Sequence, residues 1–468
     1  MITYAPICRN LIGLIILSIC FSCKNEVVET APFKATFFTP DELTYPENSI
    51  NIPDTVQRTF IDHYFLPWQA SAAVLLDSLA SFPGKELSYL ETYLNDDAWY
   101  GENKKPHKKG QRQEIVDNIN VNSFPNFQKK GIIIAHTNLR RIPSIKPGFD
   151  TYSKAGEGFP FDYFQETNLW ANTPVQIMHL SEDKLWSYVV SPYYKGWVET
   201  RDLAIASDDF ISQWINTTYC MPLSDSVNLS NDISQYTINA KMGTLLPYET
   251  ITDVSDQVEV YYAAADHNQN AKILKAQVNT NLLAFKDLNF DELQLKSLIT
   301  DLLGQPYGWG GNLENRDCSS MIRDLLGTYR IWLPRDSKDQ MTTGDYVEFP
   351  ETSEEKIKLI KDKGIPFFTI LRKPGHNMLY VGDTPNGDPM ILHAIWGLKT
   401  KYADKQLAEY LKAYPIEGIH QNSDGTLHGR HIIGEVVITS VHLGSDSPEM
   451  MSLLEEMYAM TTIPIVQD

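Results

Sequence analysis

The sequence has few cysteines, a shortage of positive charge and no apolar run long enough to cross a membrane. Five cysteines among 468 residues give no disulfide framework, even for an oxidising compartment. Lysine and arginine number 40 against 59 acidic residues, for a net charge of -19. This balance argues against nucleic acid as a partner, because phosphate binding needs a basic face. The hydrophobic share of 43% is ample for several packed domains.

The N-terminus has the pattern of a targeting segment. Arg9 precedes the apolar residues 11–19, which are too few for a transmembrane helix but suit the core of a signal peptide. A small residue before Cys23 resembles a bacterial lipoprotein signal, in which the cysteine carries lipid. We therefore expect residues 1–23 to be a lipoprotein signal and the protein to be anchored in the cell envelope, facing the periplasm; a plain secretory signal is the alternative. The polar residues 24–50 would form a tether.

The rest of the chain changes character twice. Helical patterns in residues 51–135 predict a mostly helical or irregular N-terminal segment. Short strand-like runs separated by turn residues predict two small β-barrels, at residues 136–205 and 206–281. The runs that carry this prediction are residues 131–135, 174–178, 186–190, 196–199, 241–246 and 258–262. Residues 282–468 mix helical and strand patterns, and they predict an α+β domain.

A glycine-rich loop delivers a cysteine to the start of a helix in this last domain. The loop at residues 307–311 is followed by Asp317, a suitable N-cap, and by Cys318. Apolar residues then recur at helical spacing, at Ile322, Leu325, Leu326 and Tyr329. A thiol in the first turn of a helix lies near unpaired N–H groups, and we expect this position to favour the thiolate. Cys220, by contrast, is expected to be a buried apolar thiol.

Two histidines are placed to supply the base that such a thiol needs. His376 and His393 lie in strand-like runs joined by a turn. A hairpin centred just after Thr384 puts the two histidines directly opposite each other, with Cβ atoms about 4.5–5.5 Å apart. A two-residue turn that begins at Asn386 puts Gly397 opposite His376 instead. The sequence leaves both registers open.

The first register defines a route to acyl transfer. His376 would take the thiol proton and later protonate the leaving amine, while His393 holds the far nitrogen of His376. The backbone N–H of Cys318 and the hydroxyl of Tyr307 would stabilise the oxyanion. Zinc held by the same cysteine and histidines is a weaker alternative, since no close ligand pair is present. The glycine loop also lacks the Gly-Lys-Ser/Thr of a phosphate loop, and we expect neither a metal nor a cofactor.

These motifs together resemble the NlpC/P60 cysteine peptidases of bacterial cell-wall metabolism. The segments that carry the resemblance are residues 307–311, 317–319, 333–337, 375–376 and 393–394. Residues 141–144, 161–165 and 193–198 are similar to the first SH3 domain of the subgroup with an N-terminal stabilising segment and two bacterial SH3 domains. The resemblance implies a papain-like catalytic domain, preceded by the two SH3-like barrels and the stabilising segment within the boundaries given above.

The family also implies roles for individual residues. Cys318 would be the nucleophile, His376 the base and His393 the orienting residue. The substrate would be a murein stem peptide with a free N-terminal L-alanine, cleaved between γ-D-glutamate and the diamino acid. The residues implied around the substrate are Tyr307, Trp309, Asp317, Ser319 and Ser337, with Glu166 and Tyr194 of the first SH3 domain assigned to the amine. Ser320 departs from the glycine common after Cys-Ser and is expected to crowd the helix start slightly.

The sequence as a whole predicts a monomeric, lipid-anchored periplasmic endopeptidase, whose partners are murein stem peptides and the membrane. One rival is a cysteine amidase or acyltransferase that uses the same residues on a different acyl group. Another is a wall-binding lipoprotein in which the SH3 domains act and the catalytic domain is vestigial. The interval between His376 and His393 along the chain is longer than usual in the family. This departure concerns the assignment of His393 more than those of Cys318 and His376.

Overall fold

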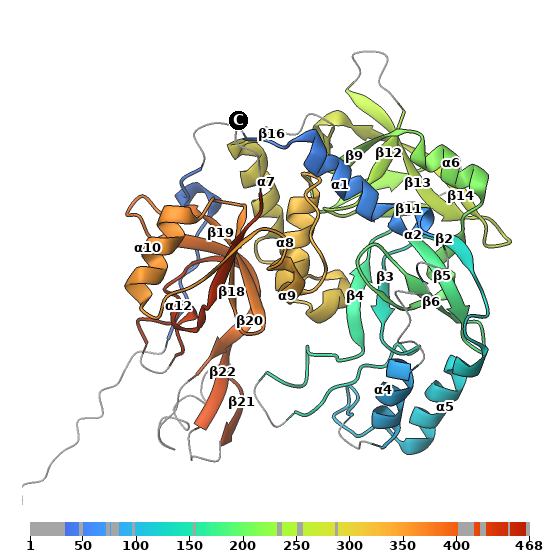
Figure 1. Cartoon of the computed structure of the whole chain (residues 1–468), viewed down its shortest axis with the longest axis horizontal. Coiled ribbons are helices and arrows are strands. Elements are labelled where there is room, and N and C mark those ends of the chain that lie inside the picture. The colour runs from blue at the N-terminus through green and yellow to red at the C-terminus, as the bar shows by residue number, and fades with distance from the viewer. Residues whose placement is uncertain are drawn as a thin grey trace, which may run out of the picture. The chain divides into compact units, whose positions relative to one another are not determined.

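Antiparallel strands and short helices alternate along most of the chain in this computed structural model (Figure 1). The structure describes residues 33–45, 50–71, 75, 84–95, 99–152, 156–231, 236–249, 256–285, 289–400, 416–421, 427–447 and 450–464. Two compact units are present, Met1–Lys34 and Ala35–Asp468. The elements described below all belong to the second unit. Cys23 and a helix expected near residues 404–412 lie outside the described residues.

Helices form the N-terminal segment, as its sequence pattern predicts. They are α1 (Asp54–Tyr64), α2 (Leu66–Gln69), α4 (Gly84–Asn95) and α5 (Lys109–Ile119). Within α1 the buried side chains Phe60 and Tyr64 lie one turn apart and belong to the main hydrophobic core. One face of this helix is therefore fixed against the body of the protein.

The expected tether is wrong for part of its length. The backbone N–H of Phe38 donates to the Ile438 carbonyl at 3.0 Å, and the N–H of Thr44 donates to the Asp383 carbonyl at 3.1 Å. Strand β1 (Ile50–Asn51) pairs with β16 (Asn289–Phe290). Residues just before the first helix thus bind the catalytic part of the chain through backbone hydrogen bonds. Every residue type except proline can donate such a bond, so the polar composition of this segment does not reveal them.

The first barrel is one curled sheet in the strand order β4-β3-β7-β6-β5-β2-β8. Its strands are β2 (Lys129–Ile133), β3 (Thr137–Arg140), β4 (Gln165–Leu169), β5 (Pro174–Leu180), β6 (Trp186–Val190), β7 (Lys195–Glu199) and β8 (Leu203–Ile205). Trp197 and Met178 are buried inside it. The strand-like runs of the sequence coincide with these elements.

The second barrel follows helix α6 (Asp208–Ile215) and combines a sheet in the order β14-β13-β12-β9-β15 with the hairpin β10-β11. Its strands are β9 (Thr218–Pro222), β10 (Val227–Ser230), β11 (Thr237–Ala240), β12 (Leu246–Tyr248), β13 (Gln257–Ala265), β14 (Ala271–Asn279) and β15 (Leu283–Ala284). The strand expected at 241–246 is wrong for most of its length, since the strand begins only at Leu246. Gly243 has φ of +80° and approaches the Asp324 Cα atom of the catalytic part, so the chain turns there.

The last domain is α+β, as predicted. Its sheet has the order β17-β23-β18-β19-β20-β22-β21. The strands are β17 (Asp345–Glu348), β18 (Thr369–Lys373), β19 (His376–Asp383), β20 (Pro389–Lys399), β21 (Ile416–Gln421), β22 (Leu427–Ser440) and β23 (Ala459–Thr462). The helices are α7 (Glu292–Leu302), α8 (Cys318–Gly327), α9 (Ser337–Gln340), α10 (Ser353–Lys363) and α12 (Leu453–Glu456).

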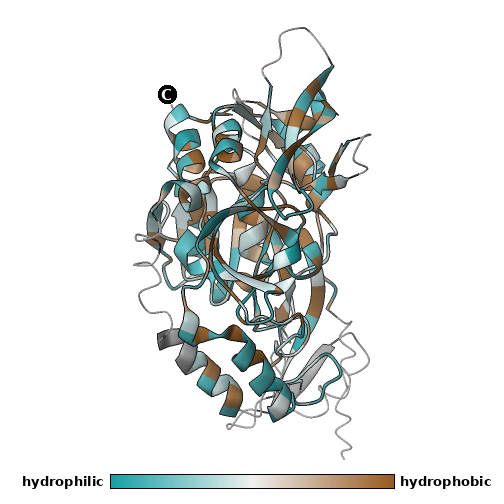
Figure 2. Ribbon diagram, turned by 90° about the vertical axis from the view of Figure 1, so that its right-hand side faces the viewer, coloured by the Kyte–Doolittle hydropathy of each residue, from teal (hydrophilic) through white to brown (hydrophobic). Residues whose placement is uncertain are grey.

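Helix α8 packs on strands β19 and β20 of this sheet. Its predicted apolar face is confirmed, since Ile322, Leu325, Leu326 and Tyr329 are all fully buried. Figure 2 shows hydrophobic and hydrophilic residues alternating along the helices, as expected for elements that bury one face. The packing of α8 fixes its first residue, Cys318, against the strand that begins at His376.

Candidate active site

Cys318 is the first residue of α8, and the helix start is held by a complete capping box. The Asp317 carboxylate accepts from the Ser320 backbone N–H at 2.9 Å. The Ser320 hydroxyl in turn accepts from the Asp317 backbone N–H at 2.9 Å. The expected crowding at Ser320 is therefore wrong, because its side chain satisfies a backbone donor that glycine would leave unpaired. Cys318 itself is 7% exposed.

Asp317 is also the centre of a buried polar cluster. Besides its capping bond, the carboxylate accepts from the Gly310 backbone N–H at 3.0 Å, from the Ser319 hydroxyl at 3.2 Å and from Arg335 at 2.6 Å. A carboxylate offers about four acceptor sites, so the protein itself occupies them all. The geometry thus gives Asp317 and Ser319 a structural role beneath the thiol, and the substrate contact expected for both stays a prediction.

The glycine loop lies against the first barrel. The Gly310 carbonyl accepts from Gln165 at 2.9 Å, and the Gly311 carbonyl accepts from Asn168 at 3.4 Å. A Cβ atom at Gly311, whose φ is +80°, would stand 2.7 Å from the Asn168 Cβ atom. These glycines therefore permit both the backbone conformation and the close approach of β4.

His376 and His393 are joined by a hydrogen bond of 2.9 Å between Nε2 of the former and Nδ1 of the latter. Neither expected register is correct. Leu379 pairs with Leu392, and a bulge follows after Tyr380. Continued toward the start of β19, this register makes the histidines diagonal neighbours on one face of the sheet, close enough for two long side chains to meet.

Thr439 extends this pair into a chain of three. Its hydroxyl lies 3.1 Å from Nε2 of His393, and it sits on β22, where Val437 pairs with His393. The three side chains thus run diagonally across β19, β20 and β22, all of them buried. Sequence reasoning missed Thr439, because a single threonine in a strand carries no pattern that separates it from its neighbours.

Burial keeps these groups neutral in the free protein. It raises the pKa of the Cys318 thiol to about 11, and the nearby Asp317 carboxylate adds to the rise. The preference for thiolate expected from the helix terminus is therefore wrong for the resting site, since desolvation and a neighbouring negative charge outweigh the dipole. Burial also lowers the pKa of His393 to about 3 and that of His376 well below its usual range. The thiol and the two imidazoles are thus all neutral at rest, where α8 packs on β19 and β20.

Two further residues of the site carry no sequence prediction. The Asn377 backbone N–H lowers the pKa of Cys318, which places this donor at the sulfur. Its side chain donates to the Ser337 carbonyl at 2.8 Å and to Gln340 at 3.0 Å. Arg335, fully enclosed, donates to Thr167 of β4 at 2.7 Å and to Ser319 at 2.9 Å. Arg335 belongs to the motif at residues 333–337, and this motif was the one feature of the sequence that could have indicated its place in the site.

Aromatic side chains of two domains meet beside the thiol. Phe161 of the first barrel lies 5.3 Å from Trp309 and 6.4 Å from Tyr307, measured between ring centroids. Trp396 of β20 stands 6.0 Å from Tyr307. Burial raises the pKa of Tyr307 well above its usual range, and Cys318 contributes, so the phenol stays protonated and able to donate. The structure thus brings Tyr307 and Trp309 together with the barrel.

The two residues assigned to a substrate amine lie near each other on the first barrel. Glu166 forms a 3.6 Å ion pair with Arg141, and burial raises the pKa of its carboxyl. Burial raises the pKa of Tyr194 to about 12, with a contribution from Glu166. Asp336 acts on both pKa values in the same direction, so the pair faces the segment that leads into α9.

The other cysteine that the structure describes is a buried thiol, as predicted. The Cys220 thiol is directed at the Leu246 carbonyl at 3.5 Å, and burial raises its pKa to about 12. Among the described residues, no cluster of histidine, cysteine and acidic side chains could hold a metal ion. Within the same ranges, no helix has the length and apolar character needed to cross a membrane.

Comparisons with known proteins identify the parts of the chain. Residues 304–413 match the NlpC/P60 family, and residues 13–124 match the NLPC_P60 N-terminal stabilising domain. Residues 147–199 match an SH3 domain of SH3b1 type, and residues 207–250 match an SH3 domain of SH3b2 type. The chain therefore carries an NlpC/P60 domain, preceded by a stabilising domain and two SH3 domains of bacterial type.

Solved structures of other proteins are similar to this chain to different degrees. An NlpC/P60 endopeptidase from Photobacterium damselae subsp. piscicida is similar with a TM-score of 0.75 and 24% identity, over 93% of this chain and 98% of that one. An NlpC/P60 family protein from Bacillus cereus is similar with a TM-score of 0.44 and 15% identity, over 72% of this chain and all of that one. No curated protein matches the sequence. The predicted fold class is confirmed, while the exact domain boundaries stay predictions.

Proposed function

We propose that this protein is a cysteine endopeptidase that cleaves the γ-D-glutamyl–L-diamino acid bond of murein stem peptides. The observation that carries the proposal is that Cys318, at the capped start of α8, lies against β19, the strand that begins with His376, and that His376 is bonded to His393. The NlpC/P60 match supports a peptidase. Two SH3 domains of bacterial type support a substrate in the cell wall.

The mechanism uses His376 as the base. Because its Nε2 is bonded to His393, Nδ1 is the nitrogen left to receive the Cys318 proton. The sulfur then attacks the γ-carbonyl carbon of the D-glutamyl residue as the S–H proton moves to Nδ1. The resulting imidazolium protonates the amine as the C–N bond breaks, which leaves a thioester. Water hydrolyses the thioester with His376 again as the base, and this releases the acid and restores the thiol.

The raised pKa of Cys318 suits this order of events. With a neutral thiol at rest, the proton moves as the sulfur attacks, and no thiolate–imidazolium pair needs to be stored in the buried site. The Tyr307 hydroxyl and the backbone N–H of Cys318 are the donors we assign to the oxyanion. Their partner is the oxygen that gains charge in the tetrahedral intermediate.

Substrates with a free N-terminal L-alanine would be selected by the first SH3 domain. Glu166 and Tyr194 offer a carboxylate and a hydroxyl to an ammonium group, and Thr167 beside Glu166 is bonded to Arg335 of the catalytic domain. This bond supports a fixed distance between the amine site and the thiol. The remaining predictions for the envelope, a lipid on Cys23, a periplasmic location and a monomeric state, are part of the same proposal.

One experiment separates this function from its rivals. The purified protein is incubated with L-Ala-γ-D-Glu-diaminopimelate, and the products are separated by chromatography. Release of free diaminopimelate that disappears in Cys318→Ala is the expected result. Cleavage that persists in Cys318→Ala would refute the mechanism, and equal cleavage of the N-acetylated peptide would refute the role of the amine. No cleavage by the native protein would favour a different acyl group or a wall-binding function.

A further inference from the structure

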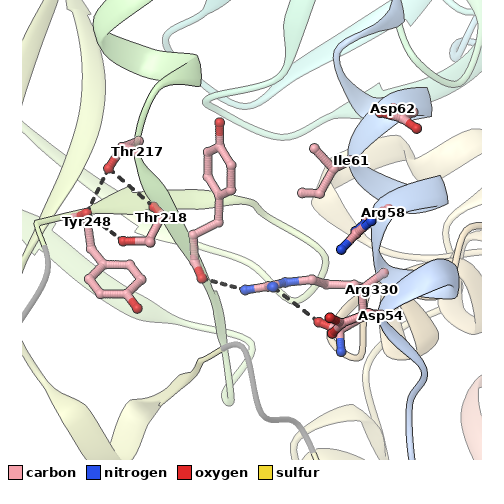
Figure 3. Close-up of a pocket in the computed structure, with 10 residues that line it drawn as sticks. Asp54, Arg58, Ile61, Asp62, Thr217, Thr218, Tyr248 and Arg330 are labelled. Carbon is pink, nitrogen blue, oxygen red and sulfur yellow. Dashed lines mark hydrogen bonds between the residues drawn. The ribbon is translucent and has the colours of Figure 1, made fainter.

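A pocket of about 300 Å³ lies between the stabilising helix α1, the second SH3 domain and the loop after α8 (Figure 3). It is therefore built by three domains of the chain. The residues that line it are Asp54, Gln57, Arg58, Ile61, Asp62, Thr217, Thr218, Tyr219, Tyr248 and Arg330. Cys318 and its histidines are not among them, so the pocket is separate from the site described above.

Arg330 is the unusual member of this lining. It is 6% exposed, and its guanidinium donates to the Tyr219 carbonyl and, at 3.2 Å, to the Gln57 side chain. Its Nε atom is buried with no hydrogen-bond partner in the structure. Figure 3 shows the side chain reaching across the pocket from the α1 side toward the second SH3 domain. One donor of a buried cation is thus left unused.

No carboxylate of the described residues forms an ion pair with Arg330. Four other buried guanidiniums each have such a partner at 2.6 Å, namely Arg140, Arg316, Arg323 and Arg335. Arg372, also buried, is bonded to the Tyr458 hydroxyl and to Asn377 instead. Burial lowers the pKa of Arg330, and none of the groups that act on it is a carboxylate. A buried charge without a counter-charge is costly, which favours an anion as its missing partner.

The rest of the lining indicates what kind of anion would fit. Arg58 lies on the exposed side of α1 and forms no ion pair within the part of the chain that the structure describes. Ile61, Tyr219 and Tyr248 supply apolar walls. The lining also holds the carboxylates of Asp54 and Asp62, so a ligand with a single acidic group aimed at the two guanidiniums and a hydrophobic body fits it better than a multiply charged anion.

We propose that this pocket binds a small carboxylate with an apolar body, whose acidic group pairs with Arg330 and Arg58. The apolar body would lie against Ile61 and the two tyrosines. Because the lining comes from three domains, the ligand would favour their assembled state and stabilise the whole chain. This binding does not depend on the peptidase activity, and it is distinct from the recognition of the substrate amine.

Hexanoate is a suitable probe, with hexan-1-ol as its neutral counterpart and acetate as an anion without the hydrophobic body. Binding to the full chain is measured by calorimetry, and the melting temperature is recorded with and without each compound. We expect saturable hexanoate binding with a rise in melting temperature, and weaker binding of both controls. The same hexanoate affinity in Cys318→Ala would show that the active site is not involved. Loss of hexanoate binding in that variant would overturn the proposal.

Variants of the two arginines test the assignment of the charge. Arg330→Gln keeps a donor for the Tyr219 carbonyl, and we expect hexanoate affinity to fall about 10- to 150-fold, the effect of losing a charge-assisted hydrogen bond. If that variant does not fold, the exposed Arg58→Gln decides, with an expected loss of several-fold. Arg201→Gln, an exposed arginine of the first SH3 domain, is the matched control. Equal binding of hexan-1-ol, no saturable binding of hexanoate, or unchanged affinity in Arg58→Gln would each overturn the proposal.

Discussion

Thr439 offers the sharpest test of how the two histidines work. If His376 accepts the thiol proton at Nδ1, its Nε2 must carry a hydrogen and donate to Nδ1 of His393. His393 then carries its own hydrogen on Nε2, which lies 3.1 Å from the Thr439 hydroxyl. The hydroxyl must therefore accept. A hydroxyl can also donate, so this bond does not set the tautomers, but it supplies the acceptor that the catalytic tautomer of both imidazoles requires.

The change Thr439→Val keeps the branched shape and removes this acceptor. The His393 Nε2–H is then buried without a partner, at a cost of about 1–3 kcal/mol. The histidines can escape the cost by moving both hydrogens, but His376 then presents an N–H to the thiol and is no longer a base. We expect kcat to fall about 5- to 150-fold, since each 1.36 kcal/mol is about tenfold in rate.

Steady-state kinetics on L-Ala-γ-D-Glu-diaminopimelate separate this effect from a general loss of structure. KM should stay near its native value, because Thr439 does not contact substrate, and Thr439→Ser should restore most of kcat. The melting temperature of each variant is the control for folding. A folded Thr439→Val with native kcat would refute the tautomer argument, and so would a change confined to KM.

Three further predictions follow from burial and backbone geometry. Because the pKa of Cys318 is raised to about 11, only about one molecule in a thousand holds a thiolate at about pH 8, so iodoacetamide should modify the native thiol far more slowly than the unfolded one; equal rates would contradict this. Because burial lowers the pKa of His393 to about 3, the unfolded chain alone takes up the proton below its ordinary pKa of about 6.5, and the free energy of unfolding should fall by about 2 kcal/mol for this residue between about pH 7.5 and pH 5. Urea titrations of His393→Gln should show a smaller fall, and an equal fall would refute the assignment. Gly311→Ala should lose about 1–3 kcal/mol, since φ is +80° and the new Cβ meets Asn168 at 2.7 Å, whereas Gly110→Ala, with nothing within 4 Å, should be neutral or slightly stabilising.

The sequence was sufficient for the elements that have a periodic pattern or a local motif. The helix after Cys318 and the strands around His376 and His393 follow from spacing and turn residues. The register between the histidines did not follow, because a bulge after Tyr380 inserts one residue without leaving a compositional signal. The predicted thiolate at Cys318 was also wrong, because the burial that raises the pKa of this thiol depends on the whole fold.

Long-range contacts were the other part that sequence reasoning could not supply. Thr439 is an ordinary strand residue until the sheet order places β22 beside β20. Arg330 follows α8 without any motif, and its burial arises only when α1 and the second SH3 domain close around it. Phe38 similarly pairs with the sheet although its neighbours along the chain show no strand pattern. The partner lies 46 residues away for Thr439 and more than one hundred residues away for Arg330 and Phe38, beyond any local pattern in each case.

Arg335 shows why the catalytic domain should not be considered apart from the first SH3 domain. Its three donor groups end on Asp317 and Ser319 under the thiol and on Thr167 of β4. Removing the SH3 domain would take away the partner of one of these donors and would expose the glycine loop that carries Tyr307. Arg335, held at only two of its three donor groups, would then fix the helix that holds the thiol less firmly. The SH3 domain therefore contributes to the geometry of the thiol itself, in addition to any contact it makes with substrate.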